Sequence, residues 1–344
     1  MNMDFERKLA IPMEVKEMYP LTQALSLVIE KRIIETKKIF SGEDKRLILI
    51  IGPCSADNED SVLEYSLKLR DLYEEVKEKI FIIPRVFTNK PRTTGEGYKG
   101  LLHQPDPKEK PDLFKGIIAT RELHMKVVKE SGLTSADEML YPENYKYIDD
   151  ILGYVTVGAR SVEDQQHRLT ASGIEIPCGM KNPTGGDFKV MLNAISAAQH
   201  AHSFIYRGWA AHSHGNEYAH AVLRGYTNMA GDNIPNYGYE NLVKLCDFYE
   251  EYELKHPALI VDTNHANSGK DPLKQPEIAE RVLESAKRDS RIKKLLKGFM
   301  VESYLEDGAQ SVDGGVYGKS ITDPCLGFEK TRKFVLELAE KLDI

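Results

Sequence analysis

Residues 47–55 read Leu-Ile-Leu-Ile-Ile-Gly-Pro-Cys-Ser, an uninterrupted aliphatic run that ends in a turn and a cysteine. Such a run predicts a strand that is buried on both faces, as in a parallel sheet. The next segment, Ser61–Lys79, is charged and amphipathic, which predicts a helix. A second aliphatic run, Phe81–Val86, predicts another buried strand. The chain therefore begins its regular part with strand, helix and strand, the repeating unit of α/β folds.

The same alternation continues to the end of the chain. Further strands are expected at Leu133–Glu138, Tyr154–Arg160, Pro177–Lys181, Ser203–Arg207, Ala258–Asp262 and Gly298–Glu302. Helices are expected at Pro111–Ser131, Pro142–Leu152, Glu163–Ser172, Phe188–His200, Tyr239–Leu254, Gln275–Arg288 and Phe328–Leu342. Eight such units predict a (β/α)8 TIM barrel, and an open doubly wound sheet is the alternative. A β-hairpin is expected after the sixth strand, Ser203–Arg207, with its second arm at Ala219–Arg224.

Residues 1–45 precede the first strand and are expected to form an N-terminal extension. A helix is predicted from Pro20 onward because Leu21, Leu25, Val28 and Ile29 recur at helical spacing, and Gly42 is a stop signal. We expect this helix to pack on the outside of the main domain or on another subunit, with a role in oligomerisation or regulation. Residues 46–344 are then expected to form the (β/α)8 barrel as a second unit.

Composition excludes several classes of function. The 344 residues carry a net charge of −7, which leaves no broad positive surface for nucleic acid. No apolar run approaches the roughly 20 residues that span a membrane, and the first residues lack the apolar core of a signal peptide. The four cysteines are Cys54, Cys178, Cys246 and Cys325. They are far apart in the sequence and form no CxxC pair, which indicates reduced thiols and a cytoplasmic location.

Most of the expected strands end in a residue that binds anions or metals. These residues are Cys54, Arg85, Glu138, Arg160, Lys181, Arg224, His265 and Glu302, and the basic loop Lys90-Pro91-Arg92-Thr93-Thr94 follows the second strand. The carboxyl ends of barrel strands converge on one face, where TIM-barrel active sites lie. The pattern therefore predicts one site assembled from all eight units.

Two groups of chemistry meet in this predicted site. The first group consists of six cations: Arg85, Lys90, Arg92, Arg160, Lys181 and Arg224. So many cations in one site require anionic ligands, which indicates at least two phosphate or carboxylate groups. Thiolate, imidazole and carboxylate are ligands of divalent metals, and this second group is Cys54, His265, Glu302 and Asp323. Their spacing forms no local metal motif. Cys54 could instead be a small buried apolar residue, and Asp323 could cap the turn before Pro324.

One glycine pattern is a decoy. Residues 95–100 read Gly-Glu-Gly-Tyr-Lys-Gly and fit GxGxxG. The residues that follow, Leu-Leu-His-Gln-Pro-Asp-Pro, cannot begin a helix, and a dinucleotide site requires one there. The sequence therefore predicts no dinucleotide site.

Six short motifs together resemble class I 3-deoxy-D-arabino-heptulosonate 7-phosphate (DAHP) synthases. They are Ile51–Ser55, Lys90–Thr94, Gly158–Arg160, His265–Ser268, Met300–Ser303 and Gly318–Asp323, and the resemblance covers about residues 15–340. It is closest to the subgroup with an N-terminal extension and an inserted hairpin. The resemblance implies a (β/α)8 barrel that condenses phosphoenolpyruvate with erythrose 4-phosphate, the first step of the shikimate pathway. It also implies a divalent metal ion, Mn²⁺, Fe²⁺, Co²⁺ or Zn²⁺.

The resemblance also implies roles for individual residues. The implied metal ligands are Cys54, His265, Glu302 and Asp323. The implied phosphoenolpyruvate-binding residues are Arg85, Lys90, Glu138, Ala159, Arg160, Lys181 and Arg224. Those implied for erythrose 4-phosphate are Lys90, Pro91, Arg92, Thr93 and Asp323. Cys54, His265 and Lys90 are the expected catalytic residues. Lys90 is expected to transfer a proton, because a lysine that is desolvated among cations can have a lowered pKa.

Other readings stay open at this level. A 3-deoxy-D-manno-octulosonate 8-phosphate synthase has related chemistry but a different motif in place of Lys90–Thr94. A Schiff-base aldolase could use Lys181, and a non-catalytic phosphosugar sensor is a third class. Residues 138–142 and the expected hairpin at 203–220 differ from the effector pockets of phenylalanine- or tyrosine-inhibited members. Whether an aromatic amino acid is an effector of this chain, and which one, is therefore open at this level. A homotetramer or homodimer is expected.

Overall fold

The computed structural model describes residues 2–92 and 94–342, and within them eight parallel strands form a barrel. The strands are β1 (Leu47–Gly52), β2 (Ile80–Pro84), β3 (Ala136–Glu138), β4 (Tyr154–Val157), β5 (Cys178–Lys181), β8 (Ala219–Leu223), β11 (Leu259–Asp262) and β12 (Leu296–Tyr304). Their hydrogen-bonded order is β2-β1-β12-β11-β8-β5-β4-β3. A parallel bridge between Arg85 and Ala136 joins the two end strands. The predicted (β/α)8 barrel is confirmed.

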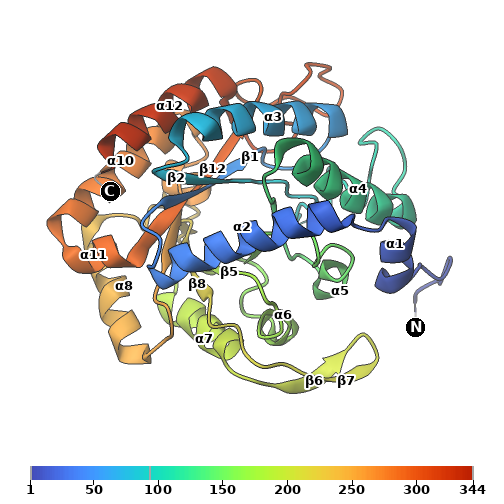
Figure 1. Ribbon diagram of the computed structural model, residues 1–344, viewed down its shortest axis with the longest axis horizontal. Coiled ribbons are helices and arrows are strands. Elements are labelled where there is room, and N and C mark those ends of the chain that lie inside the picture. Colours follow the sequence, from blue (N-terminus) through green and yellow to red (C-terminus); the bar gives the residue numbers. More distant parts are fainter. Residues whose placement is uncertain (1, 93, 343–344) are drawn as a thin grey trace.

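Helices surround the barrel, as Figure 1 shows. They are α3 (Glu59–Val76), α4 (Leu113–Ser131), α5 (Pro142–Tyr145), α6 (Gln165–Ala171), α7 (Phe188–Gln199), α8 (Tyr239–Tyr252), α10 (Gln275–Arg288), α11 (Ser290–Leu295) and α12 (Phe328–Lys341). Three short elements lie between β11 and α12: α9 (His265–Ser268), the 3-10 turn Pro272–Lys274 and β13 (Leu326–Gly327). None of the helices in the described part of the chain is both long enough and apolar enough to cross a membrane.

Strand β1 shows why its sequence is aliphatic at every position. Ile48 and Ile50 belong to the cluster inside the barrel, whereas Leu49 and Ile51 belong to the cluster between the barrel and its helices. Successive side chains of a strand point to opposite faces, and both faces here are buried. Burial of such side chains is the main favourable contribution to folding.

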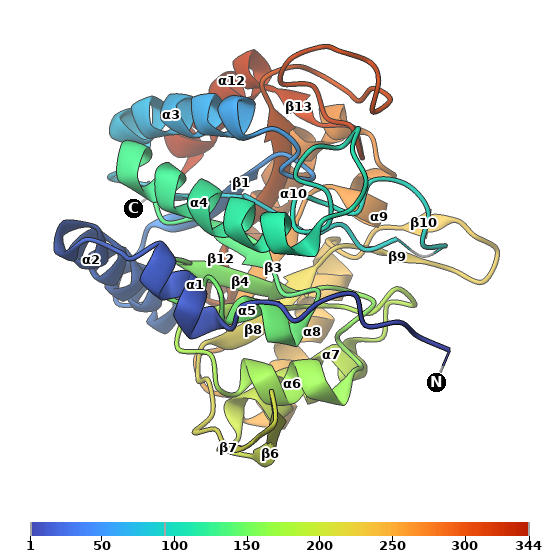
Figure 2. The same cartoon turned by 90° about the vertical axis from the view of Figure 1, so that its right-hand side faces the viewer.

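The N-terminal extension forms two helices, α1 (Pro12–Met18) and α2 (Gln23–Ser41). Thr22 caps the start of α2. The helix ends before Gly42, which has a φ of 86°, so the predicted stop signal is confirmed. The last turn of α2 places Ile39 and Phe40 in the cluster inside the barrel. Figure 2 shows α2 at the opposite end of the barrel from α9. The extension therefore closes the amino-terminal end of the barrel.

The assignment of Ser203–Arg207 as the sixth barrel strand is wrong. This segment contains β6 (Ser203–Tyr206), which pairs in antiparallel fashion with β7 (Trp209–His212) and forms a separate hairpin before the sixth barrel strand. The sixth strand is β8, the segment predicted as the second hairpin arm. A smaller hairpin does follow it, between β9 (Tyr226–Thr227) and β10 (Asn233–Ile234). A run of β-forming residues identifies a strand but not the sheet in which it pairs.

Candidate active site

A cavity lies at the carboxyl-terminal end of the barrel, and nearly all the predicted site residues line it. The lining includes Cys54, Arg85, Lys90, Pro91, Arg92, Glu138, Ala159, Arg160, Lys181, Arg224, His265 and Asp323. Glu302 is buried and contacts two of these residues. Thr93 lies outside the described residues. The strand-end pattern therefore led to one site drawn from the whole barrel.

The end of β1 comes unusually close to the end of β2. A Cβ atom on Gly52 would lie 2.2 Å from the carbonyl oxygen of Arg85, so only glycine fits this position. The Arg85 guanidinium donates hydrogen bonds to the carbonyl oxygens of Pro53 and Cys54. The Gly52-Pro53 turn thereby places the Cys54 thiol beside the buried arginine.

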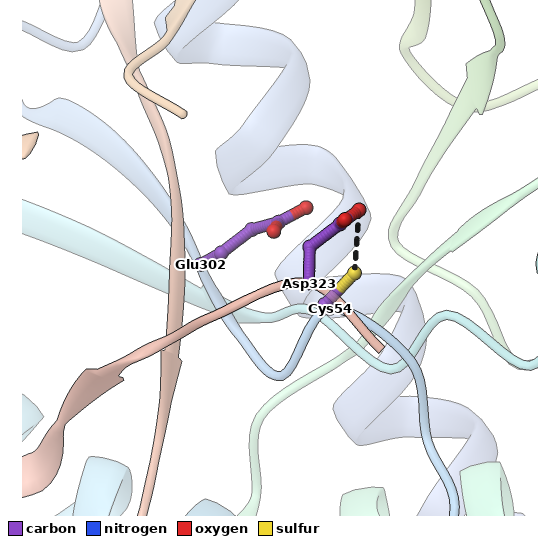
Figure 3. A group of neighbouring side chains, drawn as sticks. All are labelled: Cys54, Glu302 and Asp323. Atoms are coloured by element: carbon purple, nitrogen blue, oxygen red, sulfur yellow. Dashed lines mark hydrogen bonds between the residues drawn. The ribbon is translucent and has the colours of Figure 1, made fainter. Parts of the chain in front are cut away.

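Three of the four predicted metal ligands form a compact group. The Cys54 sulfur and one oxygen each of Glu302 and Asp323 lie within 4.8 Å of one another, and Figure 3 shows the three side chains converging. The fourth, His265, adjoins this group because its Nε2 atom lies 3.7 Å from Glu302 Oε1. Sulfur, imidazole nitrogen and carboxylate oxygen donors together suit divalent transition metals.

The imidazole of His265 is oriented by a residue that the sequence analysis did not select. Its Nδ1 atom hydrogen-bonds with Asp262 Oδ1 at 3.1 Å, which leaves Nε2 directed toward Glu302. His265 has a φ of 52°, a left-handed conformation that is costly for a residue with a side chain. Asn264, also missed, donates to Glu302 Oε2 at 2.6 Å. A carboxylate that fixes the second nitrogen of a ligand histidine is a common feature of metal sites.

Electrostatics also fit a cation at this place. Burial by itself raises the pKa of the Glu302 carboxyl, but the charges of Arg85 and His265 bring that pKa below its usual value. Lys90 and Lys270 likewise keep the pKa of Asp323 far below its usual range despite burial. Burial and the Glu302 charge raise the pKa of the Cys54 thiol. A divalent cation here would reverse that effect on the thiol and hold the negative groups together.

The expected lowered pKa of Lys90 is wrong for this structure. Burial does lower it, but the nearby Cys54, Asp323 and Glu302 groups outweigh burial and raise the pKa of Lys90 above its usual value. The Lys90 ammonium lies 2.8 Å from both the Cys54 sulfur and Asp323 Oδ2. The sequence showed the neighbouring cations, whereas the folded chain sets this lysine among anionic groups.

The inner part of the cavity carries a set of cations around Phe87. The Arg85 guanidinium stacks on the Phe87 ring at 3.7 Å, and the Lys181 ammonium lies 5.6 Å from the same ring. Lys181 Nζ lies 3.4 Å from Asp262 and 3.6 Å from Glu138. Burial, together with the charge of Arg160, lowers the pKa of Arg224. These crowded cations are suited to a ligand with a phosphate and a carboxylate.

The basic loop forms the rim of the cavity. The Lys90 amide donates to the Lys99 carbonyl at 3.0 Å, and Arg92 Nε donates to the Tyr98 carbonyl at 2.8 Å. Lys270, which the sequence analysis did not select, lines the same rim and lies 3.2 Å from Asp323 Oδ1. Lys270 comes only five residues after His265 in the sequence, and this proximity could have identified it as a site residue. The rim therefore offers a second group of cations, separate from the inner one.

Comparison with known proteins agrees with the family resemblance of the sequence motifs over nearly the whole chain. The model of the DAHP synthetase I family matches residues 28–335. The Trp-sensitive phospho-2-dehydro-3-deoxyheptonate aldolase of Escherichia coli O157:H7 is 34% identical, over 97% of this chain and 95% of that protein. The phospho-2-dehydro-3-deoxyheptonate aldolase of Haemophilus influenzae is 36% identical, over 96% of this chain and 90% of that protein.

A solved structure agrees with these relatives. The phospho-2-dehydro-3-deoxyheptonate aldolase of Francisella tularensis SCHU S4 superposes with a TM-score of 0.91 at 30% identity. The alignment covers 99% of this chain and 98% of that one. With the family match over most of its length, and as its motifs predicted, this chain belongs to the DAHP synthetase I family.

Proposed function

We propose that this chain condenses phosphoenolpyruvate with erythrose 4-phosphate and water to give DAHP and phosphate. One observation carries the proposal: a single cavity is lined by buried cations, by the cations of the basic loop and by a compact set of metal-ligand side chains. Two phosphorylated substrates, one of which also has a carboxylate, need two such groups of cations. The relatives are aldolases of the corresponding product.

The inner cations are suited to phosphoenolpyruvate. Arg85, Arg160, Lys181 and Arg224 come from different strand ends, so they can surround a small dianionic or trianionic ligand. Lys90 and the Ala159 backbone complete the same subsite in our proposal, beside Glu138. Close packing of Glu138 depends on Gly158, because a Cβ atom there would lie 2.7 Å from Glu138 Oε1.

The rim is suited to erythrose 4-phosphate. Lys90, Pro91 and Arg92 would bind its phosphate, with Thr93 and Asp323 as further predicted contacts. Lys90 thus lies between the two subsites, where its ammonium can orient both substrates. Alignment of two reactants in this way supplies a large part of the rate acceleration of a bimolecular reaction.

The reaction forms one carbon–carbon bond and releases one phosphate. The methylene carbon of phosphoenolpyruvate attacks the aldehyde carbon of erythrose 4-phosphate. Water then adds to the cationic carbon 2, and the resulting hemiketal phosphate loses inorganic phosphate. The cations of the cavity offset the negative charge of the two substrates throughout.

Cys54, His265, Glu302 and Asp323 would hold a divalent metal ion beside the aldehyde. When bound, such an ion supplies Lewis acidity toward a carbonyl oxygen. Asp262 would keep the His265 ring in place through its Nδ1 atom. Mn²⁺, Fe²⁺, Co²⁺ and Zn²⁺ all match this mixture of sulfur, nitrogen and oxygen donors.

The deciding test is an assay of phosphoenolpyruvate consumption with erythrose 4-phosphate or arabinose 5-phosphate, with and without a chelator. We expect turnover with the four-carbon sugar only, lost with chelator and restored by a divalent metal. Arg92→Ala should raise KM for erythrose 4-phosphate much more than KM for phosphoenolpyruvate. Chelator-resistant activity of Cys54→Ser or His265→Ala would refute the metal role.

The Schiff-base alternative is not favoured. A Schiff-base lysine must be free to attack a carbonyl, whereas the Lys181 Nζ atom is held in ion pairs with two carboxylates, Glu138 at 3.6 Å and Asp262 at 3.4 Å. Borohydride reduction in the presence of substrate should therefore leave Lys181 unmodified. A covalent adduct on Lys181, detected by mass spectrometry, would restore this alternative.

We also propose an aromatic amino acid effector. A second cavity lies between α5, α6 and the β6–β7 hairpin, lined by Tyr145, Lys146, Thr170, Gly173, Ile174, Phe204, Tyr206, Ala211, His212 and Ser213. Its aromatic and small side chains are suited to a flat apolar ring. Relatives are named for sensitivity to tryptophan or tyrosine. Inhibition assays with phenylalanine, tyrosine and tryptophan would identify the effector, and no response to any of them would refute the proposal.

Finally, we propose that the chain forms a homodimer or homotetramer. Apolar side chains of the two extension helices face solvent: Met13, Met18, Leu27, Val28 and Ile34. An exposed apolar surface of this kind is typical of an interface between proteins. Light scattering after size-exclusion chromatography gives the number of subunits, and a monomer at micromolar concentration would contradict the proposal.

A further inference from the structure

One buried carboxylate beside the active site faces away from it. Glu138 lines the cavity, whereas the preceding residue, Asp137, points toward α4, because successive side chains of a strand alternate. Asp137 is only 2% exposed, in a layer of mostly apolar side chains. A carboxylate in such a place is costly unless hydrogen bonds compensate for its lost hydration.

Four hydrogen bonds compensate for the burial of Asp137. Its Oδ1 atom accepts from the backbone amides of Thr88 at 2.9 Å and Glu138 at 2.7 Å. Its Oδ2 atom accepts from the Thr88 hydroxyl at 2.5 Å and lies 3.2 Å from His124 Nε2. His124, on α4, is fully buried, and its Nδ1 atom lies 2.7 Å from the Ser135 hydroxyl. An imidazole that donates from Nε2 to Asp137 and accepts at Nδ1 from the Ser135 hydroxyl satisfies this network.

The network lies where the barrel has its shortest backbone pairing. Strands β1 and β2 share five register pairs, but β2 and β3 are joined by the Arg85–Ala136 bridge, with a 2.9 Å bond from the Val86 amide to Ala136. Beyond Val86 the chain leaves this ladder. The Thr88 amide then finds the Asp137 carboxylate instead of a backbone carbonyl. A side chain thus replaces the missing strand partner at the base of the Lys90–Arg92 loop.

We propose that Asp137 is a positioning residue for the second substrate, held in place by His124. Its carboxylate fixes the segment two residues before Lys90 against the backbone of Glu138, so the rim cations keep their place relative to the inner subsite. This inference rests on the proposed function. Of the residues proposed for phosphoenolpyruvate, Lys90 and Glu138 adjoin this contact, but Arg160, Lys181 and Arg224 come from other strands and do not depend on it. Loss of the anchor should therefore affect erythrose 4-phosphate more than phosphoenolpyruvate.

The test is steady-state kinetics of Asp137→Asn and Thr88→Val, with Thr88→Ser as the conservative variant that keeps the hydroxyl. We expect KM for erythrose 4-phosphate to rise about tenfold or more in the first two variants, because displacements near 1 Å have effects of that size or larger. KM for phosphoenolpyruvate should change by less than about threefold, because the cations from the other strands still bind this substrate. Thr88→Ser should behave like the unmodified chain.

Asp150→Asn is the matched control. Asp150 forms an ion pair at 2.8 Å with the buried Arg121, which lies on α4 as His124 does, and neither partner of this pair lines the cavity. The control variant should lower the melting temperature and leave both KM values unchanged. The same outcome for Asp137→Asn and Thr88→Val would show a merely structural role and overturn the inference. If Asp137→Asn does not fold, Thr88→Val alone decides. An unmodified chain that turns over neither sugar phosphate would refute the proposed function first.

Discussion

Asp57 is a carboxylate whose ionisation opposes folding. Burial raises its pKa to about 6, and the hydrogen bond from the Tyr304 hydroxyl, at 3.1 Å, offsets only part of this. Between the unfolded pKa of 3.8 and about 6, the folded chain binds more protons than the unfolded chain. The free energy of unfolding therefore falls as pH rises through this window, and the loss persists at higher pH.

The change Asp57→Asn should remove this loss. A shift near two pKa units corresponds to about 3 kcal/mol, which is an upper limit for the gain at pH 7. Asparagine still accepts the Tyr304 bond through Oδ1. Urea unfolding at pH 7 and pH 4 measures the effect, which should be large at pH 7 and small at pH 4. Asp150→Asn should have the opposite sign at pH 7, because Arg121 and Lys16 lower the pKa of Asp150 despite its burial. Equal gains at both pH values would contradict this account.

The sequence predicted most of the residues that enter the site, but it did not predict which partners surround each of them. Arg85, Lys181 and His265 follow aliphatic strands, and barrel geometry alone brings such positions together. Asp262 and Asn264 were missed as functional residues because their roles depend on partners distant in sequence or on the local fold. Asn264, for example, binds Glu302, 38 residues away. The raised pKa of Lys90 has the same origin, since Cys54 and Asp323 approach it only in the folded chain.

The β6–β7 hairpin is an added element rather than part of the barrel. Its two-residue turn, Arg207-Gly208, has positive φ at both positions, as tight hairpins require. The Tyr206 hydroxyl and the Arg207 guanidinium donate to the carbonyls of Pro142 and Glu143. The hairpin is thus fastened to the start of α5, the segment that follows the catalytic strand end at Glu138. This connection gives the proposed effector cavity a direct link to the active site.

Filling that cavity should separate regulation from catalysis. Gly173 lines it, and an added Cβ atom there would meet only ordinary contacts, the nearest at 3.5 Å. Gly173→Val should therefore abolish inhibition by the aromatic effector while kcat/KM changes by less than about threefold, since the catalytic cations are untouched. Gly185→Ala, where an added Cβ atom meets open space, is the control and should keep full inhibition. Undiminished inhibition of Gly173→Val would place the effector elsewhere.

Strands were predicted well where aliphatic residues fill both faces. β1 and β12 follow directly from such runs, and their five register pairs confirm them as neighbours. β8 was assigned to the wrong role because Ala219–Leu223 contains a histidine and small residues, whereas Ser203–Tyr206 is the stronger β-former. Yet β8 is buried throughout and β6 is half exposed. Burial depends on the rest of the fold, which a local pattern does not contain.

At the scale of the whole molecule, the extension and the barrel share one core. The centre of the Phe40 ring of α2 lies 4.2 Å from that of the tilted His220 ring and 6.2 Å from that of the stacked Tyr154 ring, and both partners belong to barrel strands. The Tyr154 hydroxyl lies 2.8 Å from His220 Nε2, and His220 Nδ1 lies 2.8 Å from the Tyr218 carbonyl. The boundary at residues 45 and 46 therefore separates two parts of the sequence but not two hydrophobic cores.

Phe40→Ala should consequently destabilise the entire chain. Truncation of a buried phenylalanine costs about 3–5 kcal/mol through lost burial and the resulting cavity. We expect urea unfolding followed by far-ultraviolet circular dichroism and by the near-ultraviolet circular dichroism of buried tyrosines, such as Tyr65 and Tyr304, to shift together. Leu273→Ala, an exposed apolar truncation outside the extension, should shift neither signal appreciably. If only the far-ultraviolet transition moved while the near-ultraviolet transition stayed in place, the extension would unfold as a separate unit, and its role as the closure of the barrel would be wrong.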